Sequence, residues 1–362
     1  MPPREHVSSV LAALIASVGL CAPPLFPGGG ARPIEIGPPP AGLPSADVET
    51  CALCHDAIAS EWRGSQHANA WTDRLFQAAY AAEPLDACRN CHAPLNRGRP
   101  PAGVAAADGV SCSVCHVRRG AVLARSDVSA PHAVLATASL GESAFCAGCH
   151  QFGFLATVGG RQTETDEMQQ DTFGEWQRSR AGKDGVTCQA CHMPWVEDGE
   201  GRGHRSHAFR GGRDVAFVRT GLAIDVVARR EGASVLVEAT LAPQAIGHAF
   251  PTGDLFRRAE LRASAGEASA AVAFTRRFKD VPVRRGGEVL MLRRESGDSR
   301  IPPPGRGQPI RRRVRLLAPA AREVRWSFDY LLMPTPGAAS NGGDPVERLH
   351  VFEGTVPVLE VP

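Results

Sequence analysis

Five copies of one pentapeptide constrain this chain more strongly than any other feature of its sequence. Each copy reads Cys-x-x-Cys-His, and the copies begin at Cys51, Cys88, Cys112, Cys146 and Cys188. Because Cys and His each make up about 3% of the residues, one such pentapeptide is expected by chance roughly 0.01 times in a chain of this length. Five copies therefore need a common chemical reason.

The pattern is the attachment site of a c-type haem. Two thiols bond covalently to one edge of the macrocycle, and the histidine that follows supplies an axial ligand to the iron. Disulfides, zinc sites and thioredoxin-like redox pairs do not require a histidine after every second cysteine. The sequence thus predicts five c-type haems and no disulfide, with the attachment residues Cys51, Cys54, His55, Cys88, Cys91, His92, Cys112, Cys115, His116, Cys146, Cys149, His150, Cys188, Cys191 and His192.

A second axial ligand on every iron would make the haems low-spin electron carriers. Apart from the motif histidines and His6 near the N-terminus, the chain has six histidines for five irons. We expect five of them to be distal iron ligands, namely His67, His132, His204, His207 and His248. His350 alternates with apolar neighbours, as an exposed strand residue does. Surface positions for the five, a zinc site at His204 and His207, and axial ligation by Met168 or Met193 are the alternatives.

His248 is a special case because it lies beyond the last attachment site. The haem segment itself offers only four distal histidines, one short of full bis-histidine ligation. Pro251 stiffens the loop that carries His248, which suits a loop that presents one imidazole to a neighbouring domain. We hypothesise that His248 caps one haem and thereby docks the C-terminal region. The alternative is a histidine in an ordinary Pro-Thr-Gly turn.

The N-terminal segment has the features of an export signal. Arg4 precedes a mostly apolar run, 7–20, whose length fits a signal peptide better than a membrane span. We expect a signal peptide at 1–22, a Pro/Gly-rich linker at 23–45, and a periplasmic or extracellular location. Lipid attachment at Cys21 is disfavoured because Leu20 stands where a small residue is needed. No other segment predicts a transmembrane span.

The rest of the chain divides into two parts with different residue patterns. Residues 46–212 carry the motifs between short helices and loops, with a possible capping box from Thr172 to Glu175. Residues 213–362 alternate apolar and polar residues between Pro/Gly-containing turns, as an antiparallel β-sandwich does. The fold prediction is α+β multidomain. Within the first part, Glu-Trp-x-x-Ser and Asp-Gly-Val-x-Cys each occur twice, as a duplicated haem unit would give.

Charge and composition restrict the classes of binding partner that are expected. The formal net charge is +2, so no nucleic-acid partner is indicated. Lysine is nearly absent, which leaves histidine as the main iron ligand. Other redox proteins or quinol-oxidising membrane complexes are the expected partners of an exported electron carrier.

The segment from Cys51 to about Gly212 resembles exported multihaem cytochromes c related to nitrifier tetrahaem cytochromes and hydroxylamine oxidoreductase. The resemblance rests on CALCH with EWRGSQHANA, on GVSCSVCH, and on GVTCQACHMP with GHRSHAF. In such families the His of the Ser-x-His-Ala segment and histidines after Cys-His-Met-Pro are distal ligands, which implies this role for His67 and for His204 or His207. The segment GHAFPTGD from Gly247 is similar to one in C-terminal β domains of bacterial multihaem cytochromes. No Cys-x-x-Cys-Lys motif of the catalytic members is present.

These observations predict an exported pentahaem electron carrier with mostly bis-histidine haems. Several closely spaced haems divide one long electron transfer into short hops, and the protein spaces and tunes the irons. The alternative is a multihaem oxidoreductase that reduces or oxidises a small nitrogen or sulfur compound at one open haem. No catalytic residue is predicted for it.

Overall fold

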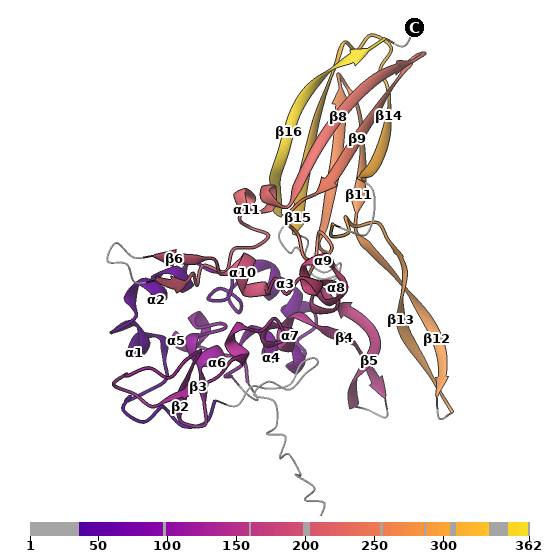
Figure 1. Cartoon of the computed structure of the whole chain (residues 1–362). Coiled ribbons are helices and arrows are strands. Elements are labelled where there is room, and N and C mark those ends of the chain that lie inside the picture. Colours follow the sequence, from indigo (N-terminus) through magenta and orange to yellow (C-terminus); the bar gives the residue numbers. More distant parts are fainter. Residues whose placement is uncertain are drawn as a thin grey trace, which may run out of the picture.

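The computed structural model describes residues 36–96, 99–158, 161–197, 203–253, 256–285, 287–304, 309–332 and 347–360. They form a region of short helices, here called the haem region, and a strand-rich β region that follows it (Figure 1). The predicted α+β multidomain fold is confirmed. The predicted signal peptide, Cys21 and most of the linker lie outside the described residues. Every described helix is too short or too polar to cross a bilayer.

The helices of the haem region are short, and the attachment motifs lie on five of them. The described helices are α1 Val48–Ala52, α2 Asp56–Arg63, α3 Arg74–Ala82, α4 Asp86–His92, α5 Val104–Ala107, α6 Cys112–His116, α7 Ala144–His150, α8 Thr172–Arg178, α9 Arg180–Lys183 and α10 Cys188–His192, with a 3₁₀ turn at Ser139–Gly141. The expected capping box at Thr172 is wrong in detail. Asp171 is the N-cap of α8, and Glu175 faces the β region instead.

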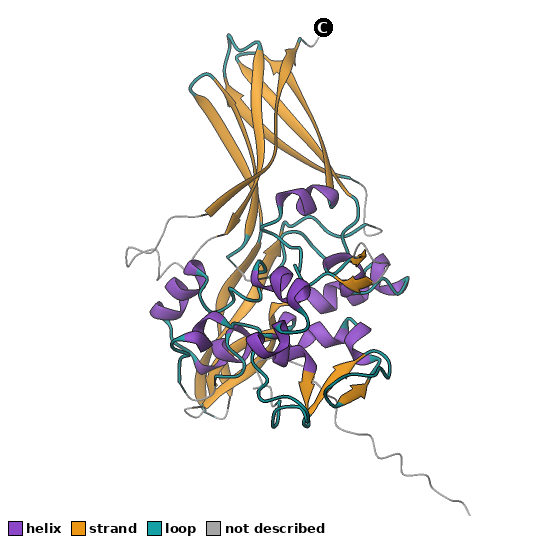
Figure 2. Ribbon diagram, turned by 90° about the vertical axis from the view of Figure 1, so that its left-hand side faces the viewer, coloured by secondary structure: helices purple, strands orange, loops and turns teal. Residues whose placement is uncertain are grey.

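Small strands fill the gaps between these helices. They are β1 Val117–Arg118, β2 Ala121–Ala124, β3 Val134–Ala136, β4 Phe152–Val158, β5 Arg161–Gln170, β6 Trp195–Glu197 and β7 Gly203–Arg205. The hairpin of β4 and β5 runs beside a second, longer hairpin from the β region (Figure 1). In the view of Figure 2, the strands of the large sheet stand above the helices.

The β region begins with α11 Val215–Thr220 and continues as strands that pair mostly antiparallel. These are β8 Leu222–Glu231, β9 Ser234–Pro243, β10 Arg258–Ala265, β11 Ala268–Phe274, β12 Arg276–Arg285, β13 Glu288–Asp298, β14 Ile310–Leu317, β15 Glu323–Leu332 and β16 Glu347–Leu359. Seven of them form one sheet in the order β11-β10-β15-β16-β8-β9-β14. Strands β12 and β13 pair only with each other.

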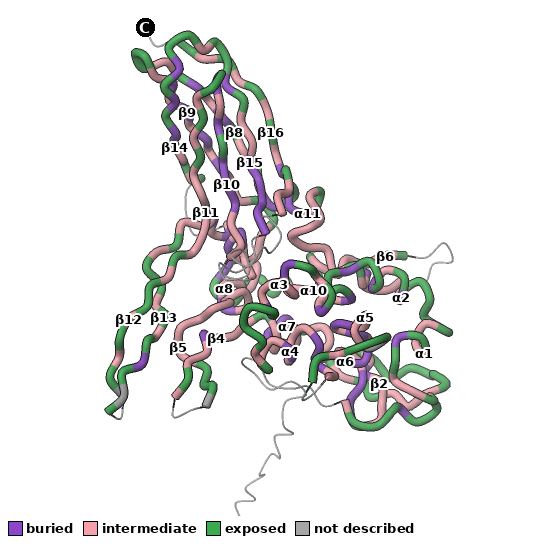
Figure 3. Tube along the Cα trace, turned by 180° about the vertical axis from the view of Figure 1, so that it is seen from behind, coloured by how far each residue is buried: buried purple, intermediate pink, exposed green. Residues whose placement is uncertain are grey.

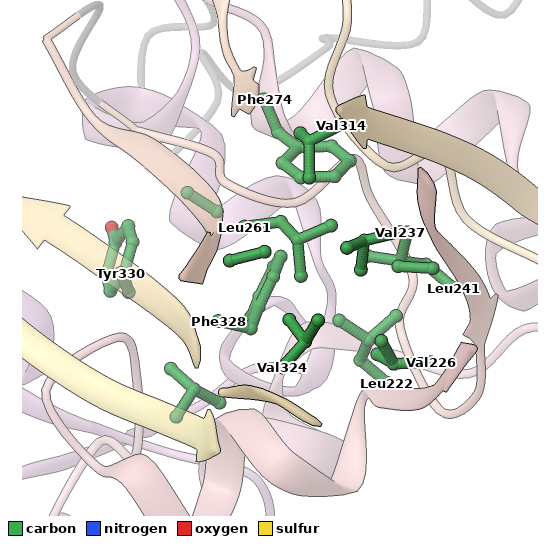
Figure 4. Packing of buried hydrophobic residues seen from close by; sticks show 14 of the residues in the cluster. Leu222, Val226, Val237, Leu241, Leu261, Phe274, Val314, Val324, Phe328 and Tyr330 are labelled. Atoms are coloured by element: carbon green, nitrogen blue, oxygen red, sulfur yellow. The ribbon is translucent and has the colours of Figure 1, made fainter. Parts of the chain in front are cut away.

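The seven-stranded sheet is a folded-over pair of antiparallel layers. Strand β16 joins the two layers through a short parallel pairing of Val358 and Leu359 with Ala228 and Arg229 of β8. Side chains of both layers meet in one apolar core, which includes Val237, Leu261 and Phe328, each with 0% of its surface exposed (Figure 4). The period-two pattern of the sequence arises here, because alternate side chains of each strand enter this core.

The haem region has no comparable core among its described residues. Its apolar clusters are small: Val48, Trp62 and Ala68 in one, and Trp71, Tyr80 and Ala93 in another. Most of its described residues are half-buried or exposed (Figure 3). Protein side chains alone therefore do not fill this region.

Two polar clamps hold the regions together. The Arg213 guanidinium donates to the Asp73 carboxylate of the haem region at 2.5 Å and to the Glu347 carboxylate of β16 at 3.3 Å. The Arg300 guanidinium donates to the Glu175 carboxylate on α8, and both side chains are about nine-tenths buried. These contacts fix where the β region meets the attachment helices.

Candidate haem site

A single large cavity runs through the haem region. Its volume is about 2330 Å³, well above the about 300–1,000 Å³ of typical small-ligand sites. All ten motif cysteines and all five motif histidines line it. The predicted attachment residues are therefore brought together around one continuous space.

Each motif forms about one helical turn. In α6, α7 and α10 the second cysteine lies three residues after the first and the histidine follows at once, so the two thiols share a helix face. In the first motif the amides of Cys54 and His55 both bond to the Cys51 carbonyl, which continues the turn of α1. Local helix geometry thus presents each thiol pair to the cavity.

Thiols of different motifs touch one another. Hydrogen bonds join Cys51 to Cys112, Cys91 to Cys149, and Cys146 to Cys188. The described motif cysteines are thiols and not disulfides. The motif of α7 therefore adjoins those of α4 and α10, and the motif of α1 adjoins that of α6.

The repeated sequence segments make equivalent contacts. The Trp62 indole donates to the Val110 carbonyl at 2.9 Å, and the Trp176 indole donates to the Val186 carbonyl at 2.8 Å. In each case a Glu-Trp helix supports the chain two residues before an attachment motif, that of Cys112 for Trp62 and that of Cys188 for Trp176. These matching contacts support the predicted duplication.

The glutamates of these repeats hold two predicted distal loops. Glu61 accepts the amide N–H of His207 at 2.7 Å, and Glu175 accepts the amide N–H of Ala249, next to His248, at 3.1 Å. This role was not predicted from the sequence. The duplicated Glu-Trp pair was the available signal.

Three predicted distal histidines face three motif histidines across the cavity. The ring centres of His67 and His150 lie 6.2 Å apart, those of His192 and His248 6.2 Å apart, and those of His116 and His207 6.1 Å apart. A histidine nitrogen binds a metal at about 2 Å and lies about 1 Å from its ring centre, so two histidines on opposite sides of one metal have ring centres about 6 Å apart. All three pairs fit one iron each.

The hydrogen bonds of the rings leave the opposite nitrogen available. Carbonyl oxygens accept Nδ1–H from these histidines, with the pairs His92–Ala70 at 2.8 Å, His116–Leu123 at 3.0 Å, His192–Arg210 at 2.6 Å, His207–Arg205 at 2.7 Å and His248–Ala249 at 3.0 Å. A carbonyl can only accept, so Nδ1 carries the proton and Nε2 keeps its lone pair. A ring whose other nitrogen donates to a carbonyl in this way is typical of metal-binding histidines.

Burial keeps four of the histidine rings that line the cavity neutral. It lowers the pKa of His67 to about 3 and the pKa values of His150, His207 and His248 to about 4, with further lowering by the charges of neighbouring histidines. Only the neutral ring binds iron. Nδ1 of His67 is also buried without a hydrogen-bond partner, which indicates a non-protein group beside it. The residues of the cavity thus fit haem.

The other two predicted distal ligands, His132 and His204, do not face a motif histidine in the same way. His132 lines the cavity beside the N-terminal segment, where the Ala133 amide donates to the Ala41 carbonyl at 2.8 Å. His204 lies outside the described cavity lining, and its Nε2 is 3.2 Å from both oxygens of Glu61. This geometry does not support His204 as a ligand, because the nitrogen that would bind iron faces a carboxylate. His350 contacts Asp329 on the β sheet.

The two methionines considered from the sequence also differ in whether they line the cavity. Met168 lies outside the described lining, and its sulfur accepts a hydrogen bond from Gln151. Met193 lines the cavity next to His192. Met291 of β13 lines the cavity as well.

Comparisons with known proteins agree with this site. Residues 50–117, which contain the first three motifs, match the family model for cytochrome c554 and c-prime. The fold is similar to that of a penta-heme cytochrome c552 from Thermochromatium tepidum, with a TM-score of 0.63 and 19% identity over 88% of this chain and 100% of that chain. No curated protein sequence matches the chain. These findings support a multihaem cytochrome c and leave the relationship to hydroxylamine oxidoreductase a prediction.

Proposed function

We propose that this protein is an exported pentahaem c-type cytochrome that carries electrons between redox partners through closely spaced, mostly bis-histidine haems. The observation that carries the proposal is the set of three histidine pairs at 6.1–6.2 Å across one cavity. Each pair joins one motif histidine to one histidine from elsewhere in the chain. An iron with two protein ligands would have no open position for a substrate. This is the arrangement expected of an electron carrier.

The contacts between motifs suggest the order of the haems. The Cys51 thiol contacts the Cys112 thiol, and the Cys115 thiol interacts electrostatically with the Cys149 thiol. From the motif of α7, Cys149 touches Cys91 and Cys146 touches Cys188. The haem of α7 is therefore proposed as a junction that adjoins those of α4, α6 and α10, with the haem of α1 beyond α6. Adjacent attachment sites imply short electron transfers.

Haem supplies one-electron redox chemistry when bound. The chain positions and tunes it. Main-chain carbonyls orient the imidazoles that would bind the irons, Glu61 and Glu175 hold the loops of His207 and His248, and burial keeps those two rings neutral. The β region takes part directly, because it supplies His248.

Remaining assignments follow from this proposal. His132 is proposed for the iron of His55, since both line the cavity and His132 lies beside the segment that precedes α1. Export to the periplasm or cell exterior follows from the c-type attachment and the N-terminal segment. Redox proteins or quinol-oxidising membrane complexes are the proposed partners.

Two measurements test the function. Intact mass of the denatured protein should show five haem additions. Electron paramagnetic resonance of the oxidised protein should show low-spin haems, and nitrite or hydroxylamine should leave the absorption spectrum unchanged. Fewer than five haems, or spectral shifts with catalytic turnover of either compound, would contradict the proposal.

A further inference from the structure

The rings of His192 and His248 lie more nearly parallel than those of the other two facing pairs. Their planes differ by 11°, whereas the planes of the other two pairs differ by 34° and 54°. His192 ends an attachment helix, but His248 lies in a loop of the β region. The contacts of that loop therefore set the angle between the two rings.

One peptide unit orients the His248 ring. The Ala249 carbonyl accepts Nδ1–H of His248 at 3.0 Å, and the amide N–H of Ala249 donates to the Glu175 carboxylate at 3.1 Å. The Thr252 hydroxyl donates to the same Glu175 oxygen at 3.5 Å. Glu175 thus fixes the residue whose carbonyl holds the imidazole.

The Arg300 guanidinium joins Glu175 to the far side of the same loop. It donates to the Glu175 carboxylate at 2.5 Å and to the Pro251 carbonyl at 3.2 Å. Two further hydrogen bonds, of 3.1 and 2.8 Å, join it to the Asp298 carboxylate. A guanidinium is planar and presents its donors in fixed directions, so contacts to three partners restrict its orientation.

The pair of Arg300 and Glu175 is buried. The Arg300 side chain keeps 9% of its surface exposed and the Glu175 side chain 10%, so loss of either partner would leave the other charge without compensation. Burial is the main cause of the low pKa of His248, and the positive charges of His192 and Arg300 lower it further. Arg300 therefore lies close to the ring as well as to the loop.

The other Glu-Trp repeat has a related arrangement. Glu61 accepts the amide N–H of His207, as Glu175 accepts that of Ala249, and the side chain of His204 lies beside its carboxylate. Glu61 keeps 27% of its side-chain surface exposed. The two repeats thus share the glutamate that holds a distal loop but differ in the side chain that holds the glutamate.

We propose that Arg300 is a positioning residue: through Glu175 and the Pro251 carbonyl, it holds the His248 ring nearly parallel to the ring of His192. This inference rests on the proposed haem binding and goes beyond it, because it assigns the orientation of one axial ligand to a residue that acts through others. The contact that joins the β region to α8 then also sets the geometry of one haem.

Ring orientation has a direct spectroscopic signature. Two parallel axial imidazoles act on the same iron d orbital, which separates the orbital energies and gives oxidised low-spin iron a rhombic spectrum with three well-spaced g values. Tilted rings leave two orbitals close in energy, and one g value becomes large. Electron paramagnetic resonance therefore reports the angle between the rings.

The test is electron paramagnetic resonance of the oxidised five-haem protein. The parent should show a rhombic low-spin signal that disappears in His248→Ala, which assigns the signal to this haem. In Arg300→Gln and in Glu175→Ala the same signal should lose most of its intensity to a signal at larger g, with five haem additions retained by mass. Arg300→Lys should show a smaller loss, because an ammonium group can pair with Glu175 but does not present the fork that also reaches Pro251.

Arg276→Gln is the matched control. The Arg276 side chain is 10% exposed, pairs with Glu295 at 2.9 Å and donates to the main-chain carbonyls of Met168 and Gln169. It is thus another buried arginine that joins the two regions, and its replacement should leave the rhombic signal of the His248 haem unchanged.

Three results would overturn the assignment. One is a rhombic signal that stays at parent intensity in Arg300→Gln or, should that variant fail to fold, in Arg300→Lys. Another is an equal loss in Arg276→Gln, which would show that any loosening between the regions has this effect. The third is a rhombic signal that persists in His248→Ala, which would remove His248 as a ligand. Because each result is compatible with five attached haems and electron transfer, it is distinguishable from a failure of the proposed function.

Discussion

The haem region and the β region are stabilised in different ways. The β region buries a continuous apolar core in which Val235, Leu261 and Phe274 are fully enclosed. The haem region buries only small clusters around a cavity of about 2330 Å³. One region is stabilised by its own side chains, whereas the other depends on groups that the side chains only surround. This difference predicts how the folding of each region responds to the loss of haem and to substitutions.

The largest expected effect comes from withholding haem. In protein made without haem attachment, amides of β9, β10 and β15 should stay protected from hydrogen exchange, because their core is complete. Amides of α4, α6, α7 and α10 should exchange at rates close to those of an unfolded chain. Hydrogen exchange with mass spectrometry measures both regions in one sample. Equal protection of the two regions would show that the haem region has a sufficient core of its own.

Replacing His248 tests the ligand that crosses from one region to the other. His248→Ala should convert one of five haems to high-spin, with all five retained by mass, because the thioethers do not depend on the distal ligand. A chain that ends after Gly212 should give the same spectrum. His350→Ala is the matched control on the β sheet and should match the parent. Five low-spin haems in both the shortened and the substituted protein would show that His248 is an ordinary loop residue and not an iron ligand.

His67 tests the pairing within the haem region. His67→Ala should convert the haem of His150 to high-spin and leave the contacts with the β region intact. His204→Ala should leave every haem low-spin, since its ring faces Glu61. Electron paramagnetic resonance distinguishes the two variants. A high-spin signal from His204→Ala alone would reverse the assignment.

The smallest expected effect concerns the Arg213 clamp between the regions. Burial raises the pKa of Asp73, but hydrogen bonds from Arg213 and the Phe76 amide outweigh it, and the pKa lies below its ordinary value. The ionised carboxylate therefore stabilises the folded protein above the unfolded pKa of about 3.9, and this contribution is lost as the pH falls through the lower folded pKa.

Asp73→Asn isolates that contribution because asparagine still caps α3. We expect a loss of about 1 kcal/mol at pH 7, seen as a lower melting temperature, and a smaller difference from the parent at pH 3. Glu49→Gln, which removes an exposed ion pair with Arg63, should change stability little at either pH. A constant difference for Asp73→Asn across this range would contradict the electrostatic explanation.

The sequence by itself determined the local features of this protein. The attachment residues could be identified because two thiols and a histidine that share one helical turn need no distant partner. The β strands were predictable because alternate burial gives a period of two, as in Val235, Val237 and Ala239. The distal roles proposed for His67 and His248 were also reached from counting and loop chemistry.

Only the tertiary structure decided which side chains meet. His204 and His207 are three residues apart, yet one ring faces Glu61 and the other faces His116. A motif specifies chemistry within one turn of chain, whereas a second ligand arrives from a distant segment. Its identity is therefore set by the packing of whole elements and not by any local pattern.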